Sequence, residues 1–117
     1  MLCVDVNILV YAHRKESPRH LAYREWLDTA RVSDEPLGIN DAVLSGFLRV
    51  VTHPRVFADP TPLTDALGFA QIVRASPSAV AVSPGPRHWS IFTNLCERGE
   101  ARGNLIPDAF FAALAIE

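Results

Sequence analysis

The chain has 117 residues, of which 49% are hydrophobic and 21% charged, and its formal net charge is −2. This composition is typical of one globular domain and excludes a disordered chain. The slightly acidic balance excludes a non-specific nucleic-acid coat protein, although it leaves room for a local basic patch. We expect a single cytoplasmic domain over residues 1–117, because the sequence has no signal peptide and no apolar run of the ~20 residues that span a membrane.

Short apolar runs alternate with helical patterns along the whole chain. Strands are predicted at about residues 2–5, 37–39 and 80–82. Helices are predicted over about residues 7–15, 17–31, 41–53, 61–74 and 88–98, and from 107 to the last residue. This alternation predicts an α/β fold with a parallel sheet and right-handed crossovers.

Several helix ends carry their own signals. Ser17-Pro18 and Thr61-Pro62 each place a capping residue before a proline, which is a common helix start, and Gly99 is expected to end the fifth helix. Trp26 and Trp89 lie at helical core spacing, so we expect both indoles to pack in the protein rather than to stack on bases.

Three aspartates stand at the mouths of helices. Asp5 ends the first strand, Asp41 follows the second, and Asp108 has a similar place in Ile106-Pro107-Asp108-Ala109. Ligands of open α/β sheets bind outside the carboxyl ends of the strands, so we expect Asp5 and Asp108 to meet around a divalent cation. The alternative for each aspartate is a structural role, as a helix N-cap or, for Asp108, in the field of the helix dipole.

Three segments together resemble PIN domains, and more narrowly the VapC ribonuclease toxins of bacterial toxin–antitoxin pairs. They are residues 4–7 (Val-Asp-Val-Asn), residues 44–52 (Leu-Ser-Gly-Phe-Leu-Arg-Val-Val-Thr) and residues 103–109 (Gly-Asn-Leu-Ile-Pro-Asp-Ala). The resemblance follows the whole chain in order and spacing. It implies a three-layer α/β/α domain that uses Mg²⁺ or Mn²⁺ to cleave structured RNA, in a tRNA or rRNA loop, and that a VapB-type antitoxin neutralises.

The resemblance also assigns roles to individual residues. Asp5 matches the first acid of the family and Asp108 the third, and Asn7 matches the polar residue that orients the first aspartate or a metal-bound water. The second acid is usually a glutamate at the place of Gly46, and Asp41, about one turn earlier, is the candidate replacement. The family's last acid follows a further strand, whereas this sequence ends at Glu117, so we expect a C-terminally truncated chain that lacks this strand.

Other residues suggest partners. Arg102 and Asn104, close to Asp108, are candidates for RNA contact. A basic cluster around the first helix junction is either a solvated face or a second contact with RNA phosphates; it comprises His13, Arg14, Lys15, Arg19, His20 and Arg24. An apolar last helix and a bare sheet edge favour a homodimer, and no membrane partner is expected.

Two other functions remain open at this stage. The first is a catalytically impaired PIN-domain remnant that binds an antitoxin without cleaving RNA, because its early apolar helices could receive a peptide segment. The second is another Mg²⁺-dependent phosphotransfer enzyme on a doubly wound sheet, which rests on analogy of fold alone.

Overall fold

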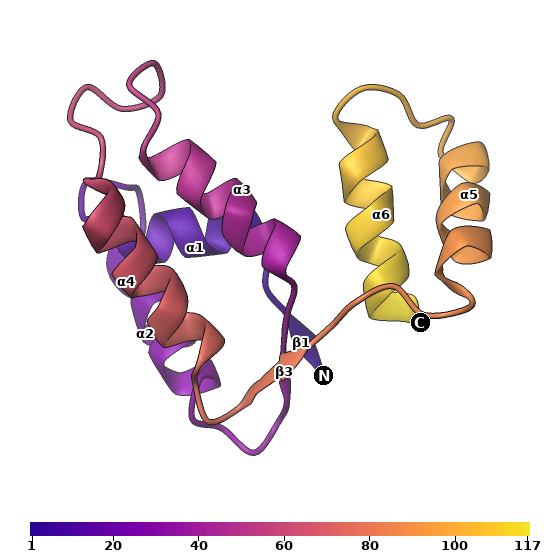
Figure 1. Ribbon diagram of the computed structural model, residues 1–117, viewed down its shortest axis with the longest axis horizontal. Helices are drawn as coiled ribbons and strands as arrows, with labels where there is room; N and C mark the ends of the chain where they lie inside the picture. The colour runs from indigo at the N-terminus through magenta and orange to yellow at the C-terminus, as the bar shows by residue number, and fades with distance from the viewer. The chain divides into compact units, whose positions relative to one another are not determined.

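The computed structural model describes residues 1–117, which form six helices and a short sheet (Figure 1). The chain divides into two compact units, residues 1–81 and residues 82–117. The first unit contains β1 (Leu2–Cys3), α1 (Val6–His13), α2 (His20–Ala30), β2 (Leu37–Ile39), α3 (Asp41–Val51), α4 (Leu63–Arg74) and β3 (Ala79–Ala81). The second contains α5 (His88–Arg98) and α6 (Leu105–Ile116). The sequence predicts that residues 1–117 form a single domain. Whether the two units together make one domain stays a prediction.

The sheet has β2 at its centre, paired in parallel with β1 on one side and β3 on the other. Leu37 stands opposite both Leu2 and Ala79, and all of β2 is buried, as a strand covered on both faces should be. The predicted parallel α/β sheet is therefore confirmed. The second strand has its predicted bounds and the third lies one residue earlier, whereas β1 ends at Cys3 because the chain turns into α1 at Asp5.

The core of the first unit lies where α1 packs against α2 and α3, and where α3 packs against α4. Phe47 of α3 is fully buried and stacks on Phe69 of α4, with ring centroids 5.1 Å apart. The edge of the His13 ring contacts both phenyl rings. Burial, reinforced by the charges of Arg14 and Arg24, lowers the pKa of His13 below its ordinary value.

Both predicted cap-and-proline helix starts are wrong in detail. Residues 17–19 form a turn, and α2 begins only at His20, after Arg19 in the left-handed region at φ 59°. Thr61 does not cap α4, because its hydroxyl accepts a hydrogen bond from Arg14 Nη1 (3.0 Å) and bonds His13 Nε2 (3.1 Å). The Thr61 hydroxyl, which the local sequence pattern assigned to capping, is therefore engaged by two residues that are distant in sequence.

The second unit is a hairpin of α5 and α6, drawn in orange and yellow in Figure 1. His88 is buried, and its Nε2 bonds the carbonyl oxygen of Phe110 (2.9 Å). The Glu117 carboxylate accepts backbone hydrogen bonds from Gly85 (2.7 Å) and Arg87 (2.9 Å), which lower its pKa. The expectation that Trp89 packs is wrong, since its side chain is 71% exposed.

The predicted end of α5 is confirmed, since the helix ends at Arg98 and Gly99 is its C-cap. Gly99 keeps a right-handed backbone with φ −89°, and Glu100 takes the left-handed conformation at φ 48°. The left-handed conformation that a glycine usually supplies after a helix is therefore taken by Glu100 instead of Gly99.

Gly46 lets α3 approach the start of α1 closely. A Cβ atom at position 46 would lie 2.9 Å from Cγ2 of Val6, nearer than two carbon atoms can pack without movement. The resembled family usually has a glutamate at this place, and in this chain such a side chain would displace Val6. Any residue larger than glycine at position 46 therefore requires Val6 to move.

We expect Gly46→Ala to lower the free energy of unfolding by about 1 kcal/mol, because crowding of Val6 outweighs the gain of about 1 kcal/mol in helix propensity. Gly68 of α4 is the matched control, since a Cβ there would meet nothing within 4 Å. Gly68→Ala should stabilise the chain by about 0.5–1 kcal/mol. Urea denaturation of both variants tests this prediction, and equal shifts of the same sign would contradict it.

Candidate functional site

Asp5 and Asp41 lie at the same edge of the sheet. Asp5 follows β1 and Asp41 follows β2, and these two strands are parallel neighbours, so their carboxyl ends point the same way. Both aspartates are exposed. The edge at which ligands of α/β sheets usually bind therefore carries carboxylates from two adjacent strands.

Asp5 is the N-cap of α1. Its backbone is extended, and its Oδ1 accepts a hydrogen bond from the backbone N–H of Ile8 (3.0 Å). The structural alternative for Asp5 is thus confirmed, but the cap uses only one carboxylate oxygen, and Oδ2 has no partner in the chain. Asn7 lies in the first turn of α1, exposed to solvent. A ligand could therefore reach Asp5 without unmaking the cap.

Asp41 is not a helix cap, because the preceding Asn40 accepts the capping hydrogen bond from Ala42 N–H (2.8 Å). Instead, Arg74 at the end of α4 donates two hydrogen bonds to the Asp41 carboxylate, from Nε to Oδ1 (2.9 Å) and from Nη2 to Oδ2 (3.3 Å). This hydrogen-bonded ion pair lowers the pKa of Asp41. A cavity of about 250 Å³ adjoins the pair, lined by Ile39, Asp41, Arg74 and residues 79–81.

Asp108 belongs to the second unit. α6 begins at Leu105, two residues before the predicted start, so Asp108 sits inside the first turn, exposed and without a capping hydrogen bond. Capping is therefore wrong for Asp108, although its charge still suits the helix dipole. Arg102 and Asn104 are exposed just before α6. The meeting of Asp108 with Asp5 stays a prediction.

Neither unit by itself gathers three or more His, Cys, Asp or Glu side chains into a cluster suited to a metal ion. Asp5 and Asp41 belong to the first unit, and Asp108 belongs to the second. As a separate finding, no helix in the structure has the length and apolar character required to cross a membrane.

The structure divides the basic cluster of the first helix junction into two kinds of residue. Four members have intramolecular partners: His13 bonds Thr61, Arg14 pairs with Glu16, His20 bonds the Tyr11 carbonyl and Arg24 pairs with Asp28. Lys15 and Arg19 are exposed and form no ion pair or side-chain hydrogen bond. Glu16, Tyr11 and Asp28 are close in sequence to the residues they bind, whereas Thr61 comes from a distant part of the chain.

The sequence family follows from comparison with known proteins. The family model of the PIN domain matches residues 2–117. The chain therefore belongs to the PIN-domain family. The VapC ribonuclease Mb2897 of Mycobacterium bovis is 50% identical over 117 residues, which cover 100% of this chain and 80% of that protein.

Two other relatives agree with this assignment to the VapC type of PIN domain. Ribonuclease VapC25 of Mycobacterium tuberculosis is 41% identical over 117 residues, covering 100% of this chain and 82% of the relative. Ribonuclease VapC33 of the same species is 33% identical over 118 residues, covering 100% and 82%. The resemblance inferred from the three sequence segments is confirmed at the level of family and fold.

Removal of Arg74 should raise the pKa of Asp41 toward its ordinary value. In Arg74→Met the carboxylate loses both hydrogen bonds and the adjacent positive charge. A depressed carboxyl pKa stabilises the fold above the ordinary carboxyl range, and this stability is lost as the pH falls through the folded-state pKa. The variant should therefore lose less stability in acid than the parent chain.

Carboxyl NMR titration of Asp41 measures this change directly. Arg24→Met is the matched control, because it breaks the surface pair with Asp28 on α2 and should leave the Asp41 midpoint in place. An unchanged Asp41 midpoint in Arg74→Met would show that the ion pair does not form in solution.

Proposed function

We propose that this chain is a metal-dependent endoribonuclease of the VapC type that cleaves structured RNA. The observation that carries the proposal is the match to the PIN domain over residues 2–117, together with whole-chain identity to proteins named ribonucleases. The exposed Asp5 at the carboxyl end of β1 supports it, because this is the edge at which α/β folds place their ligands.

The cation in this proposal is Mg²⁺ or Mn²⁺, held by Asp5 and Asp108 with help from Asp41. Hard cations prefer carboxylate oxygens, and Asp5 Oδ2 is uncommitted in the chain. Asp41 would assist only after Arg74 releases it, since both of its oxygens are engaged. When bound, such a cation lowers the pKa of a coordinated water and offsets the charge that develops on the phosphate.

The protein's own residues have the following proposed roles. The Ile8 N–H fixes the orientation of the Asp5 carboxylate, which presents its free oxygen at the edge of the sheet. Asn7, the exposed second residue of α1, orients Asp5 or a water molecule through its side-chain amide. Arg102 and Asn104 contact the RNA from the segment before α6, the arginine by charge and the asparagine by hydrogen bonds.

A VapB-type antitoxin is the proposed protein partner, and a homodimer is the proposed assembly. The second candidate function is antitoxin binding without cleavage. One observation favours it: the Asp41 carboxylate, the candidate replacement for the glutamate absent at Gly46, is occupied by Arg74. A chain with fewer available acids would bind a cation weakly and could keep its partner while losing its chemistry.

We expect the purified chain with Mn²⁺ to cut total RNA at discrete sites, and Asp5→Asn to reduce this cleavage by about 100-fold, the scale seen when one electrostatic group of an active site is removed. Asparagine caps helices about as well as aspartate, so this variant loses the charge while α1 keeps its N-cap. Asp5→Ala should lose both the cleavage and about 1 kcal/mol of stability. Gel analysis with an EDTA control, together with thermal denaturation, measures both effects.

Each other outcome has a definite meaning. Undiminished cleavage by a folded Asp5→Asn variant would remove Asp5 from the proposed metal site. If the folded parent chain bound a VapB-type antitoxin but cut no RNA, the second candidate function would replace the first.

A further inference from the structure

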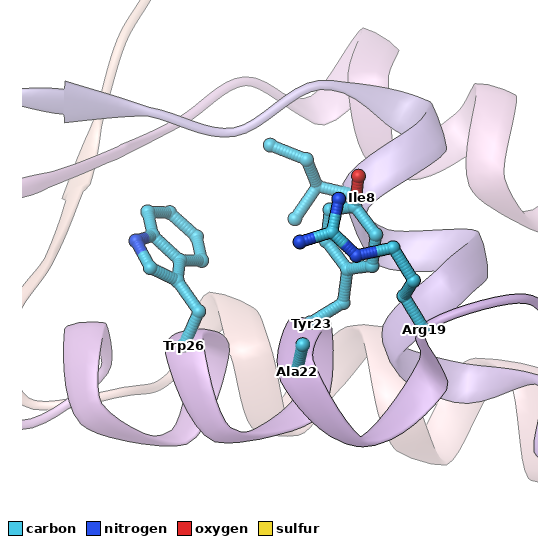
Figure 2. A pocket seen from close by; sticks show the side chains of 5 residues that line it. All are labelled: Ile8, Arg19, Ala22, Tyr23 and Trp26. Atoms are coloured by element: carbon cyan, nitrogen blue, oxygen red, sulfur yellow. The ribbon is translucent and has the colours of Figure 1, made fainter.

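A cavity of about 320 Å³ lies between α1 and α2. One face of α2 and its preceding residue supply most of the lining, at the helical spacing i, i+3, i+4 and i+7, and α1 supplies one residue. The lining residues are Ile8, Arg19, Ala22, Tyr23 and Trp26 (Figure 2). The cavity thus combines two aromatic rings and an aliphatic wall with a single cation.

The aromatic part of the cavity is held in place but incompletely covered. Tyr23 packs against Tyr11 of α1, with ring centroids 5.2 Å apart, which fixes the phenol ring. Trp26 was expected to be a packing residue, yet its side chain is 38% exposed. Figure 2 shows the indole at one end of the cavity and the Arg19 guanidinium pointing in from the other, with Tyr23 between them. A flat ring entering the cavity would find an aromatic surface.

The cationic part is available to a ligand. Arg19 and Lys15 have no acidic partner, and two nearby acids are occupied: Glu16 by Arg14 and Asp28 by Arg24. A second, more open cavity adjoins the first and shares Arg19 and Ala22 with it; its lining is Lys15, Ser17, Arg19, His20, Leu21 and Ala22. Arg19 therefore stands where the aromatic cavity meets a basic one, and Lys15 lines the basic cavity, on a chain whose net charge is −2.

We propose that the α1–α2 cavity binds one unpaired nucleotide of RNA, with the base stacked on Trp26 and Tyr23 and its phosphate held by Arg19 and Lys15. Aromatic platforms next to basic side chains are the usual means of binding single-stranded nucleic acid. The volume lies at the lower end of the range of about 300–1,000 Å³ found for small-ligand sites, which suits one nucleotide better than a folded segment.

The cavity is also well placed for the proposed chemistry, and in taking RNA as its ligand the inference rests on the proposed function. Ile8 lines the cavity, and its backbone N–H is the group that holds the Asp5 carboxylate. One wall of the nucleotide site, Ile8, therefore lies one helical turn along α1 from the candidate metal ligand Asp5. A base bound here would position a neighbouring phosphate at the carboxyl edge of the sheet, so the cavity would select RNA loops that present an unpaired base.

The test measures binding of a short, fluorescently labelled single-stranded oligoadenylate to the full chain by anisotropy, with EDTA present so that no cleavage occurs. We expect Trp26→Ala to weaken binding about tenfold, within the range for loss of one stacked base, and Trp26→Phe to keep most of the affinity. Trp89→Ala, which removes the chain's other tryptophan from the second unit, is the matched control and should bind like the parent.

The charge is tested separately. Arg19→Asn keeps a residue type that tolerates the left-handed backbone, and it should reduce the dependence of affinity on salt by about one phosphate contact. Arg55→Asn, in the exposed segment between α3 and α4, is its control and should leave affinity and salt dependence unchanged. Thermal denaturation of each variant establishes that the fold is retained.

The outcomes separate this inference from the proposed function. Binding that depends on Trp26 and Arg19, in a chain that cuts no RNA, would support the nucleotide site and contradict the nuclease. Cleavage that requires Asp5, with oligoadenylate binding unchanged in Trp26→Ala and Arg19→Asn, would overturn the nucleotide site alone. Loss of antitoxin binding in Trp26→Ala, with RNA binding intact, would also overturn it and assign the cavity to a peptide.

Discussion

The parallel pairing of β2 with strands on both sides is the constraint on which the rest of the first unit depends. The strands are only two or three residues long. Because they are parallel, the residues that directly follow each strand lie at the same edge of the sheet. Asp5 and Asp41 lie at the same edge because β1 and β2, which precede them, are paired in parallel. All of β2 is buried, as expected of a central parallel strand with both faces covered.

The carboxylates at this edge also serve the fold. Asp5 satisfies a backbone N–H at the start of α1, and Asp41 ties α3 to the end of α4 through Arg74. The two arrangements differ in what they leave for a ligand, because the cap engages one oxygen of Asp5 whereas the guanidinium engages both oxygens of Asp41. Structural and chemical roles are therefore compatible at Asp5 and compete at Asp41.

The junction between α1 and α2 shows how one basic run can serve two purposes. Arg14 and His13 face inward to Thr61, and Arg14 also lies over the Phe57 ring at 4.1 Å from its centroid, so these residues fasten the segment that precedes α4. Arg19 and Lys15 are exposed and have no partner within the chain. The left-handed backbone of Arg19 costs energy for a non-glycine residue, and the fold tolerates it at the rim of the α1–α2 cavity.

The sequence by itself determined the elements whose signals are local. Apolar runs and helical periodicity were enough for β2, for α5 and for the parallel α/β class, and the order of three motifs was enough for the family. The tertiary structure decided what depends on distant partners: Thr61 bonds His13 instead of capping α4, Arg74 engages Asp41, and Val6 crowds position 46. Local propensity determines the position of a helix or strand to within a few residues. The hydrogen-bond partner of a polar side chain, in contrast, can be any group that folding brings within reach. Sequence spacing therefore cannot identify pairs such as Asp41 and Arg74 or His13 and Thr61, which lie 33 or more positions apart.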